Sequence, residues 1–291
     1  MTNLVRFSVA VVAVLGVTTA SLPAFGQNTE ATEVTATSAL EKARQALAAF
    51  SSIEYEFRRE SVGPGKQTNQ SRRSERGRFE YADGKSRSEY AIDADDYKMS
   101  GIIAFDGKNY QLKDESRPIL SIRADEMHPY VVVQPVMFPF LYFLVRPDPT
   151  KQPRLDLETY RAPNSWTATK DAASLNGRRE VDGHPCAVVN VEHKPPARPA
   201  NREACLALDL DCYPILITAD SGPGGSSSST IRIVEIADLT TSKGRVIVPI
   251  CIEGKFHNQA NGNQTTINMT IDKQTLKVNE PIDGMRFNLK Q

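Results

Sequence analysis

Two Asp-Gly pairs constrain the fold most strongly, because each lies between two segments in which apolar and polar residues alternate. The pairs are residues 83–84 and residues 106–107. Asp-Gly favours the tight turn of a two-residue hairpin, in which the backbone must adopt positive φ. The four flanking segments are residues 78–81, 88–92, 101–105 and 109–112. The pattern therefore predicts two antiparallel hairpins in succession.

Most of the rest of the chain also consists of short segments with a strand pattern. Further candidate strands are residues 53–57, 119–123, 187–191, 206–210, 215–218, 231–236, 246–256, 265–271 and 276–279. Strands at this spacing, with few helical patterns between them, favour one antiparallel sheet or barrel over βαβ units.

One clear helix is predicted at about residues 39–51, directly before the first strand. Ser38 and Glu41 have the spacing of a capping box. The apolar residues that follow at helical spacing are Leu40, Ala43, Leu47 and Phe50. A second helical region is possible at about residues 124–147.

The first 26 residues have the pattern of a secretory signal. Arg6 is followed by an apolar run at residues 7–17, and small residues end the segment at Gly26. Eleven apolar residues are too few to cross a bilayer, which needs about 20. We therefore expect a signal peptide at residues 1–26, a flexible leader at 27–37, and one domain at 38–291. An N-terminal membrane anchor is the alternative.

Charge and composition exclude other classes of protein. Lys plus Arg and Asp plus Glu both number 35, which argues against a general nucleic-acid binder. A second apolar stretch at residues 130–145 contains Pro135 and Pro139, and these disfavour a membrane-spanning helix. We interpret the stretch as a buried segment or a lid. The protein is expected to be periplasmic or secreted, and not membrane-spanning after signal cleavage.

The four cysteines permit two disulfides in an exported chain, with three possible connectivities. They are Cys186, Cys205, Cys212 and Cys251. Cys186 and Cys212 would face each other if their segments formed a hairpin, but four free buried thiols fit the sequence equally well.

Motifs for catalysis or metal binding are missing. The sequence contains neither HExxH nor GxSxG. The set of His184, Cys186, His193 and Cys205 does not have paired zinc spacing. A calcium loop that started at Asp93 would place Lys98 where Gly is needed. We therefore predict no catalytic residue, no metal and no cofactor.

A basic run has two interpretations. Its arginines are Arg72, Arg73, Arg76 and Arg78. Arg76 and Arg78 would share one face of a strand, and that face could meet an anionic head group. Alternatively, the run is a charged solvent face balanced by Glu75 and Glu80.

The layout as a whole resembles the periplasmic lipoprotein-carrier superfamily, the LolA/LolB-like proteins and outer-membrane lipoprotein-sorting proteins. Three parts carry the resemblance: the helix and strand at residues 40–57; the hairpins at 77–110, with Arg87 and Tyr90; and the series 231–236, 246–256, 265–271 and 281–287. The resemblance extends over most of residues 38–291.

This resemblance implies a mainly β fold, an incomplete antiparallel barrel or strongly curved sheet, with an N-terminal helix and a helical or irregular lid. Its concave apolar face would take up acyl chains. Candidate lining residues are Phe79, Tyr81, Tyr90, Ile103 and Phe105, and candidate lid residues are Phe138, Phe140, Leu141 and Phe143. Each of these side chains would equally suit an ordinary core.

The expected function is that of an exported, non-enzymatic carrier that binds an acyl lipid or a lipoprotein. A protein-interaction or stress-sensing module of the same fold, with envelope proteins as partners, is the alternative. An enzyme whose catalytic groups lie far apart in the sequence is a third hypothesis.

Overall fold

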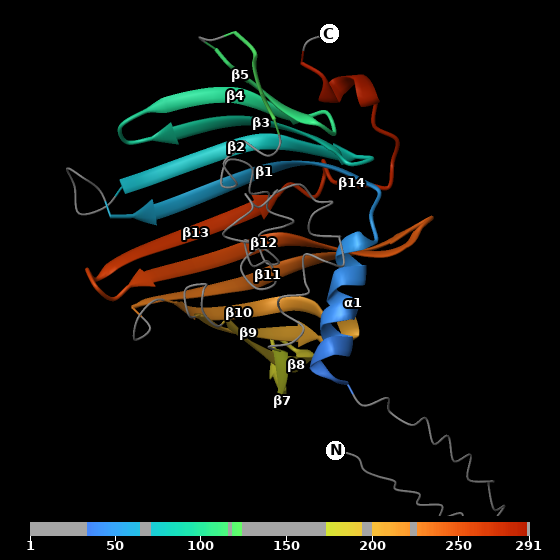
Figure 1. The fold of residues 1–291 in the computed structure, drawn as a ribbon, viewed down its shortest axis with the longest axis vertical. Helices are drawn as coiled ribbons and strands as arrows, with labels where there is room; N and C mark the ends of the chain where they lie inside the picture. Colours follow the sequence, from blue (N-terminus) through green and yellow to red (C-terminus); the bar gives the residue numbers. More distant parts are fainter. Residues whose placement is uncertain are drawn as a thin grey trace, which may run out of the picture. The chain divides into compact units, whose positions relative to one another are not determined.

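The strands of the computed structural model form one antiparallel sheet that is not closed into a barrel (Figure 1). The described residues are 34–64, 71–115, 118–123, 173–193, 200–221 and 226–289. Within them the sheet has 14 strands, and no pairing joins the two end strands, β6 and β7. This confirms the predicted fold class, a mainly β protein built on an open antiparallel sheet.

Two meanders make up the sheet. The first runs through β1 (Ser52–Gly63), β2 (Ser71–Ala82), β3 (Lys85–Ala94), β4 (Lys98–Phe105), β5 (Asn109–Asp114) and β6 (Leu120–Arg123). The second runs through β7 (Ala173–Val181), β8 (His184–His193), β9 (Ala200–Ala207), β10 (Tyr213–Ser221), β11 (Ser227–Thr241), β12 (Gly244–Asn258) and β13 (Asn263–Ile271). Each strand pairs with the next in sequence, and β1 pairs with β13 to join the meanders. The short β14 (Lys277–Val278) also pairs with β1.

Both predicted Asp-Gly hairpins are present. Asp83 and Gly84 have φ of 49° and 75°, as the tight turn between β2 and β3 requires. At the next turn, the backbone N–H groups of Lys108 and Asn109 both donate to Asp106 Oδ1 at 2.8 Å. A third Asp-Gly hairpin, between β7 and β8, went unpredicted although Asp182 and Gly183 carry the same signal.

The helix α1 (Ala36–Ala48) begins three residues before the predicted start. Its N-cap is Thr35, whose hydroxyl accepts a hydrogen bond from the Ser38 backbone N–H at 3.1 Å. Ser38 Oγ accepts from the Thr35 N–H in return at 3.0 Å, so the capping box is Thr35 with Ser38. The predicted cap of Ser38 with Glu41 was therefore wrong. Glu41 lies one turn further on and accepts a hydrogen bond from Arg44 Nε at 2.9 Å.

The strand prediction at residues 206–210 was wrong in part. Residues 208–210 form a turn of 3-10 helix, η4 (Leu208–Leu210), after which Asp211 and Cys212 adopt positive φ. In the C-terminal segment, for which no strand was predicted beyond residue 279, residues 284–287 form another turn of 3-10 helix, η6 (Gly284–Phe287). Both places are points at which the chain leaves the sheet or reverses.

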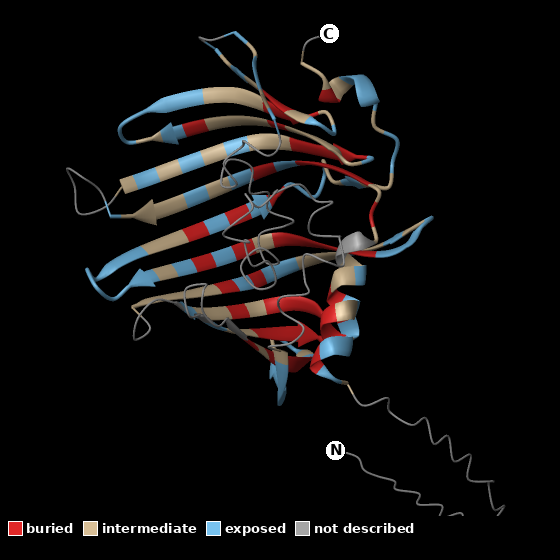
Figure 2. Ribbon diagram, in the orientation of Figure 1, coloured by how far each residue is buried: buried red, intermediate tan, exposed pale blue. Residues whose placement is uncertain are grey.

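Over β1 and β2, the main core lies on one face of the sheet. We call this the apolar face and define it by Ile53, Tyr55 and Phe57 of β1, which are buried. The opposite face, which carries Glu54, Glu56 and Arg58, is the polar face. Figure 2 shows that buried residues gather at one end of β1, β2 and β4.

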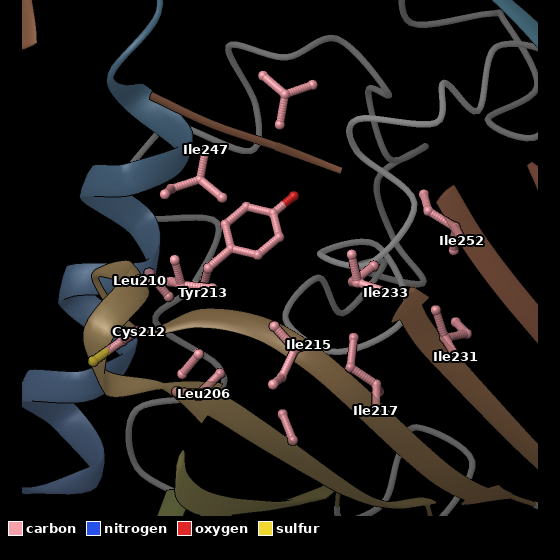
Figure 3. Packing of buried hydrophobic residues seen from close by; sticks show 14 of the residues in the cluster. Leu206, Leu210, Cys212, Tyr213, Ile215, Ile217, Ile231, Ile233, Ile247 and Ile252 are labelled. Carbon is pink, nitrogen blue, oxygen red and sulfur yellow. The ribbon is translucent and has the colours of Figure 1, made fainter. Parts of the chain in front are cut away.

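The helix α1 packs over part of the apolar face, mainly against β7, β10 and β12. Its buried residues Ala39, Leu40 and Ala43 join a large hydrophobic cluster. Figure 3 shows isoleucines of β10 to β12 in the same cluster. No helix within the described ranges is long and apolar enough to cross a membrane.

Candidate ligand-binding faces of the sheet

The five predicted lining residues all lie on the apolar face. Ser88 stands opposite both Phe79 on β2 and Ile103 on β4, so these two apolar side chains share one face. Ser86 likewise stands opposite both Tyr81 on β2 and Phe105 on β4, so these two side chains also share that face. Tyr90 of β3 follows on that face, because alternate residues of a strand point to the same side.

These residues divide between two clusters. Phe79 and Tyr81 belong to the main core, where the ring of Phe50 meets Tyr81 edge-on at a centroid distance of 6.3 Å. A second cluster contains Ile103, Phe105 and Tyr110, all at most 5% exposed. The partly buried residues that pack against it are Tyr90, Leu112 and Ile122. We call this set, drawn from β3 to β6, the β3–β6 cluster.

The β3–β6 cluster is distinct from the core beneath α1. Among the described residues it contains none from the helix. Its central contact is between Phe105 and Tyr110, which lie opposite each other on β4 and β5 with ring centroids 4.7 Å apart. The four predicted lid residues, Phe138, Phe140, Leu141 and Phe143, lie outside the described residues.

The polar face carries a buried ion cluster that the sequence did not reveal. Glu54 and Glu80 stand directly opposite each other on β1 and β2, and Glu80 is 1% exposed. Arg78 Nε lies 3.0 Å from Glu80, and Arg286 of η6 pairs with the same carboxylate. Lys277 of β14 lies 3.2 Å from Glu54. Burial raises the pKa of Glu80, and the nearby arginines only partly offset it.

This ion cluster fixes the C-terminal segment onto the polar face. Arg87 Nη1 donates to the backbone carbonyl of Arg286 at 3.0 Å. The backbone N–H of Leu289 donates to the side-chain oxygen of the buried Gln111 at 2.7 Å. Phe287 is buried between these two attachments at 1% exposure. The signal in the sequence was Glu80, an acid within a predicted strand, but its partner lies more than 200 residues away.

The arginines of the basic run differ in whether they form ion pairs. Arg73 pairs with Glu75 at 3.2 Å, and Arg78 pairs with Glu54 and Glu80. Glu75 and Glu80 therefore do balance these two arginines. They do not form one charged solvent face, because Arg73 and Arg78 lie on opposite faces of β2 and Glu80 is buried. Arg76, on the polar face, forms no ion pair within the described ranges and adjoins a hollow considered below.

The cysteines are free thiols in this structure. Cys186 and Cys212 do not face each other across a hairpin, because β9 lies between β8 and β10. Cys186 and Cys205 are fully buried, and burial raises the pKa of Cys186 to about 11. A thiol with a raised pKa is a poor nucleophile. No metal-binding group of His, Cys, Asp or Glu occurs in the described part of the chain.

Comparison with known proteins gives similarity in structure alone. No family model and no curated protein matches the sequence. The chain is similar to a LolA superfamily protein from Nitrosomonas europaea at 12% identity, covering 88% of this chain and 99% of that one, with a TM-score of 0.46. It is also similar to MucB, solved in complex with MucA(peri), at 10% identity, 84% and 100% coverage and a TM-score of 0.22. The first of these carries the name of the superfamily that the sequence layout resembles.

Proposed function

We propose that this protein binds the acyl chain of a lipid on the apolar face of β3 to β6, as a carrier or binding module without catalytic activity. The observation that supports this most is the β3–β6 cluster. It places aromatic and branched side chains on one face of an open sheet, apart from the core that α1 contributes to. Such a surface suits an acyl chain, which needs apolar area and no catalytic group.

The energetics favour a long apolar ligand. Each methylene moved from water to an apolar surface contributes about 0.8 kcal/mol, so ten would contribute roughly 8 kcal/mol before the costs of association. Ile103, Phe105 and Tyr110 are buried in this structure. The β3–β6 cluster must therefore open to admit the chain, and part of that gain is spent on separating its side chains.

The compartment belongs to the same proposal. A signal at residues 1–26 would export the chain to the periplasm or the medium, where lipids and lipoproteins in transit need a carrier. The ligand would be an acyl lipid or the acylated end of a lipoprotein.

A protein-interaction role is the second candidate, and one observation favours it. The β3–β6 cluster is already buried, as expected if the fold needs no ligand to complete its core. The terminal strand β7 is exposed along most of its length, and such a strand can pair with a segment of another protein. A protein that takes up no lipid but captures an extended segment at β7 would support this role.

Lipid that copurifies with the protein tests the main proposal. We would express the chain with export to a bacterial periplasm, extract the purified protein with organic solvent, and quantify lipids by mass spectrometry. The expected result is about one acyl lipid per chain. A protein free of lipid, which also takes up no fluorescent fatty acid, would contradict the proposal.

A pair of matched variants locates the ligand. Leu112→Glu places a charge in the β3–β6 cluster, whereas Leu216→Glu makes the same change at a partly buried position against the main core. We expect the first variant to lose bound lipid and the second to keep it, while circular dichroism shows both folded. Equal loss in both variants would indicate a general effect on folding.

A further inference from the structure

A hollow of about 890 Å³ crosses six strands on the polar face. Its floor follows a row of directly opposed residues that runs from Ile271 on β13 through Phe57, Gly77, Tyr90 and Gly101 to Asp114 on β5. The side chains of these residues point to the apolar face. The walls are therefore polar-face residues on either side of the row, and the hollow is separate from the β3–β6 cluster.

Two arginines face each other in one wall. Arg58 on β1 stands directly opposite Arg76 on β2, and both side chains line the hollow. Like charges at directly opposed positions of a sheet are destabilising. Neither guanidinium has an ion pair or a side-chain hydrogen bond within the described ranges, so no direct contact there offsets their repulsion.

Arg58 and Arg76 belong to a second row of opposed residues, on the polar face, and their nearest neighbours in that row are small and uncharged. Thr270 lies beyond Arg58 on β13, whereas Ala91 and Ser100 lie beyond Arg76 on β3 and β4. Ala91 leaves space next to Arg76. The row thus offers two guanidinium groups, with a threonine hydroxyl at one end, to a small group that enters the hollow.

Some nearby carboxylates already have other partners, whereas Glu56 and Asp272, which also line the hollow, pair with no basic side chain within the described ranges. Glu89 pairs with Arg87 at 2.6 Å, and Asp93 with Lys98 at 2.8 Å. Glu115 accepts a hydrogen bond from Ser100. Glu56 and Glu60 flank Arg58 along β1 without pairing with it within the described ranges. These two carboxylates repel anions. The site therefore favours a single compact anion over a strongly acidic polymer.

We infer that Arg58 and Arg76 form a binding site for the phosphate group of a small soluble molecule. Two planar guanidinium groups on adjacent strands can each donate to a different pair of oxygens of a tetrahedral oxyanion. The bound anion would remove the repulsion between the arginines. The recessed position favours a soluble phosphate compound over a membrane, because a flat bilayer cannot follow a hollow across six strands.

Calorimetric titration with inorganic phosphate at low ionic strength tests the inference, with sodium chloride at equal ionic strength as the reference. We expect saturable binding of one phosphate per chain. The double variant Arg58→Gln with Arg76→Gln should weaken that binding at least about tenfold. Its urea midpoint should equal or exceed that of the unchanged protein, because the opposed charges are gone.

The matched control is Lys255→Gln. Lys255 is an exposed cation on β12 and does not line the hollow, so the change removes a charge without touching the site. Phosphate binding should be unchanged in this variant. Equal weakening in control and double variant, or absence of saturable binding to the unchanged protein, would overturn the inference. The inference would also be overturned if the protein bound phosphatidylglycerol vesicles, but neither phosphatidylcholine vesicles nor free phosphate.

Discussion

Glu80 shows how much at the residue scale depends on partners that are distant in sequence. The hairpin signal next to it was sufficient to place it on a strand, and its alternation with Phe79 and Tyr81 was sufficient to place it on the face opposite to theirs. Its burial was not predictable, because Arg286 and Phe287 cover the same face only after the C-terminal segment folds back. Local patterns assign a residue to a face, but they do not reveal what covers it.

Stability should respond to pH through Glu80. Because burial raises its pKa above the ordinary 4.5, the unfolded chain ionises this group first as the pH rises. Ionisation therefore favours unfolding, and the contribution of Glu80 is greatest below about pH 4.5 and declines as the pH passes its pKa in the folded state. Glu80→Gln removes this dependence.

The measurement is the free energy of unfolding by urea between pH 4.5 and pH 7 for both proteins. The stability of the unchanged protein, relative to Glu80→Gln, should fall as the pH rises. A relative stability that increases with pH would mean that the arginines outweigh the effect of burial.

At the scale of elements, the first meander depends on glycines that lie beneath aromatic rings. A Cβ on Gly77 would lie 2.0 Å from the carbonyl oxygen of Glu89 and 3.0 Å from the ring of Phe57. A Cβ on Gly101 would lie 2.8 Å from the Tyr90 hydroxyl. The strands therefore approach one another here more closely than a side chain allows. The same row forms the floor of the hollow on the polar face.

Gly77→Ala should destabilise the protein by about 1–3 kcal/mol, because the backbone of β3 must move to admit the methyl group. Gly284→Ala is the matched control, since a Cβ there meets nothing within 4 Å and its φ is not positive. Urea denaturation compares the two variants. Similar midpoints would show that β2 and β3 can separate at little cost.

Element boundaries show which sequence signals were sufficient. The Asp-Gly turns were reliable, because few other sequences adopt positive φ so easily. The helix start was predicted three residues too late because Ser38 fits two capping patterns. It can be the N-cap itself, or it can be the N3 residue of a capping box whose N-cap is Thr35. Thr35 also caps well, and the choice depends on the packing of Ala36 and Ala39 against the sheet.

At the scale of the whole described fold, the pairing of β1 with β13 was not predictable. It joins residues more than 200 positions apart, such as Phe57 with Ile271, and no local pattern encodes that register. The resemblance in layout nevertheless led to the open antiparallel sheet and to one common face for the five predicted lining residues. Whether they meet a ligand depends on the opening of the β3–β6 cluster, which a sequence pattern does not describe.

The most direct test is to locate a bound acyl chain on the sheet. A fatty acid with a photoreactive group near its methyl end would be bound to the delipidated protein, cross-linked by light, and mapped by peptide mass spectrometry. Acyl-chain binding on the apolar face predicts cross-links in β3 to β6, at or beside Tyr90, Phe105 and Tyr110, and their loss in Leu112→Glu. Cross-links confined to the polar face, or an equal yield from the denatured chain, would contradict it.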